Sequence, residues 1–150
     1  MKSVEFHHGI ADKLDYACRL LRKAYGRGAR VVVTADAATL RQLDRQLWVF
    51  EEQDFVPHVC ALAGQTWAPR LADTPLWLTD DPASAPGERS VLINLGDEIP
   101  PGVERFERFF DVVSSEPDDR QRGRQRWRQY QSLGWTVDAH DASKPQESRP

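Results

Sequence analysis

The residues best suited to chemistry in this sequence lie in the stretch RQRGRQRWRQY, at positions 120–130. Arginine occupies every second position from Arg120 to Arg128, and aromatic residues close the stretch. A guanidinium group matches a carboxylate or a phosphate through two parallel hydrogen bonds, and an aromatic ring offers a flat apolar surface. These residue types therefore predict a site that binds an anion.

A helix is the expected structure here, because arginine and glutamine are good helix formers and Pro117, followed by two aspartates, is typical of a helix start. Residues three and four apart lie on the same face of a helix. One face then carries Arg120, Arg124, Trp127 and Arg128. This face is either a binding surface or a solvated surface whose arginine stems cover the aromatic rings.

The two remaining arginines and the glycine of the stretch have other positions. Arg122 and Arg126 point toward another face of the same helix. Gly123 costs about 1 kcal/mol relative to alanine inside a helix. It therefore predicts either a close approach to a neighbouring element or fraying of the helix.

The charge of the chain bears on which anion is bound. The formal net charge is −3, and the arginine stretch contributes +5, so the rest of the chain carries −8. Single-stranded nucleic acid could place its phosphates on the arginines and its bases on Trp127. An acidic peptide with a free carboxyl terminus fits the guanidinium forks equally well. Because an acidic protein repels a long polyanion more than a short tail, the peptide is favoured and direct binding of nucleic acid is not expected.

Patterns typical of enzymes and metal sites are not found. The segment GRGAR at 26–30 resembles part of a dinucleotide fingerprint, but it precedes a strand, so its glycines cannot place a helix start on a pyrophosphate. His7 and His8 are adjacent, whereas His58 and His140 are isolated, so none has the spacing of a zinc site. We expect no catalytic residue, no metal and no cofactor. A small-molecule-binding or hydrolytic α/β enzyme remains the alternative, because carboxylates from distant segments can converge.

A second candidate surface lies in LWVFEEQDFVPH, at positions 47–58. Aromatic side chains here, including Trp48 and Phe55, surround a charged middle. Such residues usually belong to the core, but exposed aromatic clusters also form the centres of protein interfaces. Trp48 follows the apolar stripe of its helix by one position, so partial exposure is expected. The residues alone leave core and interface equally open.

The expected elements alternate between strands and helices, which is typical of a three-layer α/β domain with a mostly parallel sheet. Buried strands are expected at residues 3–6, 30–35, 75–79 and 90–95. A first amphipathic helix spans 11–26 with Asp12 as its N-cap, and Asp36 caps a second. The segment 106–114 fits either a short helix that runs into a strand or a strand alone.

Length and composition indicate one globular domain. The chain has 150 residues, of which 40% are hydrophobic and 29% charged. No apolar run approaches the roughly 20 residues of a membrane span, and the amino terminus lacks the pattern of a signal peptide, so we expect a cytoplasmic protein. Residues 1–142 are expected to form the domain, and the polar segment 143–150 a disordered tail.

The order of these motifs resembles the chi subunit of bacterial DNA polymerase III holoenzyme over roughly residues 3–138. The resemblance is carried by RVVVTA, LDRQLWVFEEQDFVPH, SVLINL, FFDVV and RQRWRQYQSLGW. It implies a Rossmann-like α/β fold without a nucleotide site. It also implies a non-catalytic accessory subunit of the clamp loader in bacterial DNA replication.

The resemblance further implies two partners. The acidic carboxyl-terminal tail of single-stranded DNA-binding protein would bind at Val113, Arg120, Arg124, Trp127 and Arg128. Trp127 stands where this family often has tyrosine. The psi subunit, or a replacement partner such as a helicase, would bind at the surface that contains Trp48 and Phe55.

Overall fold

The computed structural model describes residues 2–49 and 56–143 and has an α/β architecture. Seven strands form its sheet: β1 (Ser3–Ile10), β2 (Val31–Thr34), β3 (His58–Cys60), β4 (Leu76–Leu78), β5 (Val91–Asn94), β6 (Arg108–Ser114) and β7 (Thr136–Asp141). The α-helices are α1 (Lys13–Gly26), α2 (Ala37–Val49) and α3 (Pro117–Ser132). Short 3-10 helices span Pro69–Asp73, Pro82–Ser84 and Val103–Arg105.

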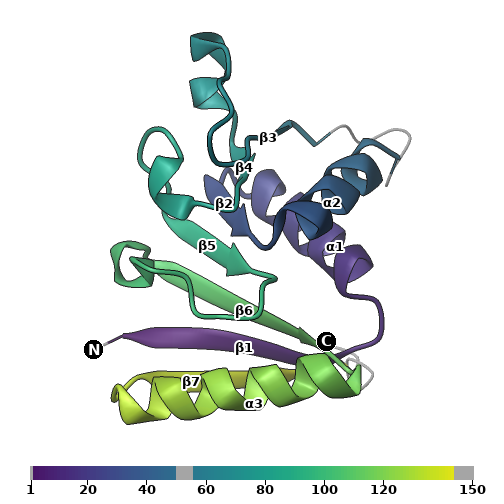
Figure 1. Ribbon diagram of the computed structural model, residues 1–150, viewed down its shortest axis with the longest axis vertical. Helices are drawn as coiled ribbons and strands as arrows, with labels where there is room; N and C mark the ends of the chain where they lie inside the picture. The colour runs from purple at the N-terminus through teal and green to yellow at the C-terminus, as the bar shows by residue number, and fades with distance from the viewer. Residues whose placement is uncertain (1, 50–55, 144–150) are drawn as a thin grey trace.

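The sheet has the order β3-β4-β2-β5-β6-β1-β7, and every strand pair in the described part of the chain is parallel. The first strand, β1, therefore lies between β6 and β7 (Figure 1). Because parallel strands share one direction, the carboxyl ends of β1 and β6 and the start of α3 meet at the same edge. This arrangement brings residues of three distant segments together.

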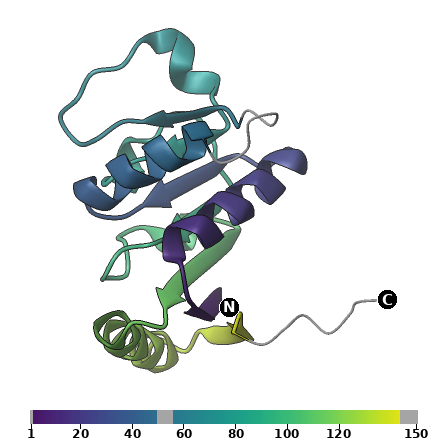
Figure 2. The same cartoon turned by 90° about the vertical axis from the view of Figure 1, so that its right-hand side faces the viewer.

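Helices cover both faces of the sheet, as Figures 1 and 2 show. Alternation along β6 illustrates the division: Phe110 and Val112 pack in the core beneath α1 and α2, whereas Phe109 and Val113 pack in the core beneath α3. The fold is thus a three-layer α/β domain, as the sequence predicts, with a sheet that is parallel throughout its described strands.

Helices α1 and α2 begin at the capping residues that the sequence predicts. The side chain of Asp12 accepts a hydrogen bond from the Asp15 N–H at the start of α1, and Asp36 accepts one from the Thr39 N–H at 3.1 Å at the start of α2. Both contacts satisfy amide groups that a helix start leaves without partners. The buried residues of these two helices, which face the sheet, are Ala17, Cys18, Leu21, Leu40, Leu43 and Leu47.

Two strands differ from the sequence expectation, because neither β3 nor β7 is predicted. Strand β3 has three residues, too few for a periodic pattern. Strand β7 is largely exposed at the edge of the sheet, so its sequence TVDAHD lacks an apolar run. The ambiguous segment 106–114 forms a strand, β6, that follows a 3-10 turn.

No helix in the two described ranges is long and apolar enough to cross a membrane. Cys18 is buried and Cys60 is half-buried, and both are free thiols.

Gly123 is the point of closest approach between α3 and the sheet. A Cβ atom at this position would lie 2.8 Å and 2.9 Å from the two γ-carbons of Val113 on β6. Of the two interpretations of this glycine, close packing is therefore confirmed. The glycine allows α3 to lie directly on β6. The residues of α3 around Gly123 are therefore also close to the sheet.

Gly123→Ala is expected to destabilise the protein by about 1 to 3 kcal/mol, as overpacking of a core does. Helix propensity alone would give the opposite sign, a gain of about 1 kcal/mol. The free energy of unfolding in urea measures the difference. Gly26→Ala is the matched control, because a Cβ there has no atom within 4 Å and no loss is expected. Adding Val113→Ala should recover part of the loss, and two strictly additive losses would contradict the contact.

Candidate functional site: a groove beside α3

A groove of about 870 Å³ lies between α3, β1 and the residues that follow β7. Its lining includes four residues that the sequence predicts for one site, namely Val113, Arg120, Arg124 and Trp127. Phe6 and His8 of β1 line it as well. We call this hollow the α3 groove.

The apolar part of the α3 groove is built by β6, β1 and α3. Val113 is 2% exposed, and it lines the groove from the sheet. The rings of Phe6 and Trp127 meet edge to face, with their centroids 4.9 Å apart and an angle of 84° between their planes. Trp127 is half-buried, so one part of its ring packs on the core while another part faces the groove. This arrangement offers an apolar wall to a ligand.

The charged part consists of Arg120 and Arg124, which lie one helical turn apart and are exposed. Within the described chain, no carboxylate lies within 4.0 Å of either guanidinium group. Arg128 is exposed but does not line the groove. Successive residues turn by about 100° around a helix, so Arg128 is rotated away from the sheet relative to Arg120. The structure thus brings four of the five predicted residues together and places Arg128 beyond them.

In contrast to Arg120 and Arg124, Arg126 is buried. It is 1% exposed and belongs to a polar network beneath α3. Its Nε donates to Asp111 Oδ2 at 2.8 Å, and its Nη1 donates to the Asp97 carbonyl at 2.7 Å. The Tyr130 hydroxyl donates to the same Asp111 oxygen. Asn94 donates to the other oxygen at 3.4 Å.

Burial acts to lower the pKa of Arg126, but the Asp111 carboxylate raises it above its ordinary value. Burial, together with Asp111, raises the pKa of Tyr130. The network therefore holds a charged pair and a neutral phenol. Sequence reasoning does not identify it, although one acid inside the apolar run FFDVV is a signal that a basic partner is needed.

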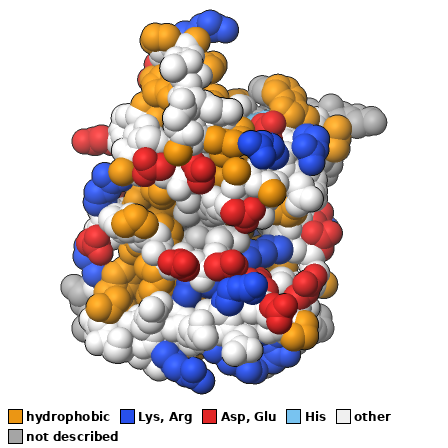
Figure 3. Space-filling model, viewed as in Figure 1, with side chains coloured by type: hydrophobic (Ala, Val, Ile, Leu, Met, Phe, Trp, Pro, Cys, Tyr) orange, Lys and Arg blue, Asp and Glu red, His pale blue; other side chains and the backbone are white. Residues whose placement is uncertain are grey.

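The amino-terminal end of α3 is tied to the sheet by Asp119. Its Oδ2 accepts hydrogen bonds from the Ser114 N–H at 2.7 Å and from Lys13 Nζ at 3.0 Å. Burial acts to raise the pKa of Asp119, but these contacts lower it below its usual range. Glu116 and Asp118 are exposed beside it. Figure 3 shows acidic side chains around this end, and Lys and Arg side chains along the helix.

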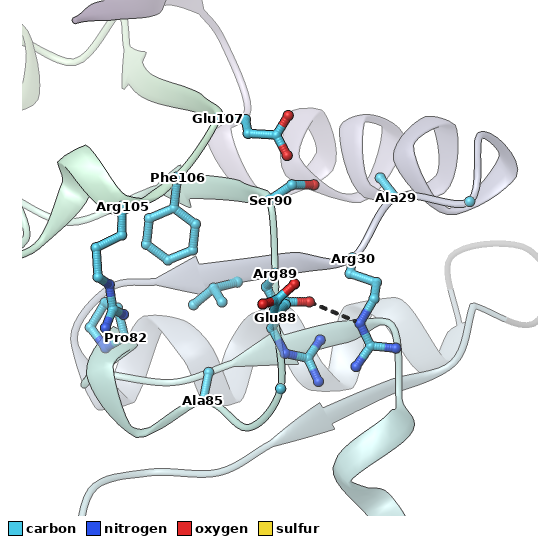
Figure 4. A pocket seen from close by; sticks show the side chains of 13 residues that line it. Ala29, Arg30, Pro82, Ala85, Glu88, Arg89, Ser90, Arg105, Phe106 and Glu107 are labelled. Atoms are coloured by element: carbon cyan, nitrogen blue, oxygen red, sulfur yellow. Dashed lines mark hydrogen bonds between the residues drawn. The ribbon is translucent and has the colours of Figure 1, made fainter.

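A second hollow, of about 540 Å³, lies at the amino ends of β2, β5 and β6 (Figure 4). Its two most prominent arginines are committed to the backbone. All three nitrogens of Arg30 and all three of Arg89 donate to carbonyl groups, and both side chains share the Ala72 carbonyl. These arginines hold neighbouring loops together through backbone carbonyls.

The histidines that are apart in the sequence meet in the structure. His7 on β1 lies opposite His140 on β7, with ring centroids 4.8 Å apart, and it hydrogen-bonds the Tyr16 hydroxyl. Burial, followed by the charge of His140, lowers the pKa of His7 from 6.5 to about 4. In the described residues, no group of three or more His, Cys, Asp or Glu side chains could hold a metal ion.

The second candidate surface lies at the end of α2. Trp48 is 58% exposed, and its ring centroid lies 5.0 Å from that of His58. Val49 next to it is 73% exposed. Trp48 is therefore on the surface and not in the core. Phe55 lies outside the described residues, so its place on this surface stays a prediction.

Comparison with known proteins gives a consistent family. The family model described as DNA polymerase III chi subunit, HolC, matches residues 1–138. The DNA polymerase III subunit chi of Pseudomonas aeruginosa is 36% identical over 129 residues, which cover 85% of each chain. That of Haemophilus influenzae is 27% identical over 124 residues, 82% of this chain and 83% of its own.

A likeness to a solved structure gives information on the fold alone. The carboxyl-terminal domain of a variant of S. cerevisiae Dbp5, solved with Gle1 and IP6, has a TM-score of 0.59 and 12% identity. The likeness covers 91% of this chain and 89% of that one. At such low identity it indicates a shared α/β architecture and no shared activity.

His7 predicts a pH dependence of stability. Its pKa is about 4 when folded and ordinarily 6.5, so the unfolded chain binds a proton first as the pH falls. The His7 contribution to stability is therefore present above pH 6.5 and is lost as the pH falls toward about 4. Urea unfolding across this window should show a steeper loss for the natural protein than for His7→Gln. Equal slopes for the two proteins would contradict the assignment.

Proposed function

The chain belongs to the DNA polymerase III chi subunit family, and from this premise we propose that it is an adaptor with two binding surfaces. The family makes it an accessory subunit in DNA replication and not the catalytic one. In our proposal, the α3 groove binds the acidic carboxyl-terminal tail of single-stranded DNA-binding protein. The surface around Trp48 binds a psi subunit or a replacement partner such as a helicase. The clamp loader is thereby linked to coated single-stranded DNA.

One observation carries the first part of this proposal: the α3 groove combines an apolar wall with two arginines that have no carboxylate partner among the described residues. Two other arginines of α3 are already paired, since Arg122 lies 3.5 Å from Asp97 and Arg126 is bonded to Asp111. A ligand that presents both an apolar side chain and carboxylates would complement the groove.

Each part of such a tail has a matching residue. We assign the terminal carboxylate to Arg124, because a guanidinium fork can bind both of its oxygens. The apolar terminal side chain fits the wall made by Val113 and Trp127. Acidic residues further up the tail would meet Arg120.

The charges at the two ends of α3 limit where an acidic tail can lie. Glu116 and Asp118 are exposed at the amino-terminal end, where they would repel an acidic chain. Arg128 is exposed on the next turn beyond the groove. We therefore infer that Arg128, like Arg120, contacts an acidic residue upstream of the terminus, and that the tail does not extend past Arg120 toward Glu116 and Asp118.

A protein tail suits this site better than nucleic acid does. The net charge of the chain is −3, and the unpaired arginines are confined to one side of α3. A long polyanion requires a basic surface of wider extent.

As a replication adaptor the protein would work in the bacterial cytoplasm, with residues 1–142 as its functional domain and no cofactor.

The second surface is proposed on the exposure of Trp48 and Val49 at the end of α2. Large apolar groups that stay on the surface of a folded domain often mark a protein interface. This surface lies on the α1 and α2 face of the sheet, whereas the α3 groove lies on the opposite face. Both partners could therefore bind at the same time.

Arg124→Lys tests the assignment of the terminal carboxylate. Lysine keeps the charge but loses the fork, so the affinity for a synthetic tail peptide should fall almost as far as with Arg124→Ala. A charge-assisted hydrogen bond contributes about 1.5 to 3 kcal/mol, which corresponds to a loss of roughly ten- to a hundredfold. Calorimetric titration measures it, and amidation of the peptide terminus should produce the same loss in the natural protein.

Arg122→Lys is the matched control, since Arg122 is on the same helix but is directed to Asp97. The affinity of this variant for the tail peptide should be unchanged. Combining Arg124→Ala with the amidated peptide should cost little more than either change alone. Two additive losses would show a diffuse electrostatic surface. Tight binding to bare oligonucleotide, with a steep dependence on salt, would favour direct contact with nucleic acid.

Trp48→Ala should abolish capture of a psi-like or helicase partner by immobilised protein, while titration with the tail peptide stays unchanged. The fold should survive, because the Trp48 side chain is already largely exposed. Phe55→Ala is expected to reduce capture in the same way. Recovery of the same partner with both variants would overturn the assignment of this surface.

A further inference from the structure

We infer that His8 makes tail binding dependent on protons: its imidazole takes up a proton when a carboxylate of the tail enters the α3 groove. The inference rests on the proposed function, since it concerns the same groove and the same ligand. It adds a residue of β1 to a site that the sequence places on β6 and α3 alone.

The backbone of β1 directs His8 to the groove. Phe6 and His8 are two positions apart on a strand and lie on the same side of the sheet, with their ring centroids 6.1 Å apart. His8 is half-buried and lines the groove together with the two unpaired arginines. Its carbonyl accepts a hydrogen bond from the Ala142 N–H at 2.8 Å, which anchors the strand at this point.

The neighbouring Gly9 keeps β1 and β7 close beside His8. Its φ angle is +72°, and a Cβ atom there would lie 2.6 Å from Asp141 Oδ1. The pairing of β1 with β6 also shifts its register between His7 and Ile10. An irregular stretch of backbone, close to β7, therefore carries His8 in the lining of the groove.

The ionisable groups around His8 come from three elements. Arg120 and Arg124 face the groove from α3, and Asp141, the register partner of His8, faces it from β7. The Oδ1 atom of Asp141 already accepts from the Ser143 N–H at 3.0 Å and from the Ser143 hydroxyl. Strand β6 and the residue after it contribute Val113 and Ser115, which are neutral.

Two further histidines, His7 and His140, are paired on the opposite side of the same strands. Among the described residues that line the groove, only His8 belongs to a type whose charge ordinarily changes between about pH 5 and 8.

The sign of the effect follows from these charges. A bound tail brings carboxylates that offset the arginines and accept a hydrogen bond from the protonated imidazole. Binding therefore favours protonated His8. The affinity should be highest at low pH, decrease as the pH rises through the range in which histidine loses its proton, and level off above it.

Calorimetric titration of the natural protein with a synthetic tail peptide tests this inference. The affinity at about pH 5.5 should exceed that at about pH 8 by roughly three- to tenfold, as expected for one added charge contact. Titration in two buffers with different ionisation enthalpies should show net proton uptake. Circular dichroism at both pH values verifies that the protein is folded.

Three variants separate His8 from other groups. His8→Gln should show no gain in affinity between about pH 8 and about pH 5.5. His8→Lys, which is charged throughout, should bind more tightly than the natural protein at about pH 8. His140→Gln is the matched control, because it removes a histidine from the same pair of strands on the other side of the sheet, and it should keep the pH dependence.

An affinity that does not vary with pH, or a dependence that persists in His8→Gln, would overturn the inference while tail binding at about pH 8 still supported the proposed function. Absence of peptide binding at both pH values would overturn both. An amidated peptide identifies the carboxylate involved. Proton uptake that persists with it supports contact with an acidic side chain of the tail, and uptake that disappears supports contact with the terminal carboxylate.

Discussion

The buried carboxylate of Asp111 is the constraint on which the candidate site depends. A carboxylate without partners inside a core is strongly unfavourable, so its neighbours must supply donors. Arg126 and Tyr130 supply them from two successive turns of α3, and Asn94 supplies one from β5. Once these contacts form, the rotation and position of α3 above the sheet are set. The glycine contact with Val113 then determines how closely the helix approaches.

The arginines of α3 consequently have two different roles, although they occur in one repetitive stretch. Those directed toward the sheet and its loops, Arg126 and Arg122, are paired with aspartates and stabilise the position of the helix. Those on the other flank, Arg120 and Arg124, have no carboxylate partner in the described chain and line the groove. The buried Arg126–Asp111 pair fixes the helix that carries the exposed arginines, so their backbone positions are set before a ligand binds.

The groove and the Trp48 surface lie on opposite faces of the sheet, a layout suited to an adaptor. Neither surface requires the other to move, since a parallel sheet separates them. In the hollow at the amino ends of β2, β5 and β6, by contrast, Arg30 and Arg89 are used by backbone carbonyls.

By itself, the sequence determined the features that depend on residues close together in the chain. Helix caps, the apolar strands and the shared face of Arg120, Arg124 and Trp127 follow from local hydrogen bonds and from periods of two and 3.6 residues. Only the tertiary structure decided which distant groups meet. It paired Asp111 with Arg126, made an edge strand of β7 and placed His8 in the groove, because such contacts depend on how separate elements pack and leave no local period in the sequence.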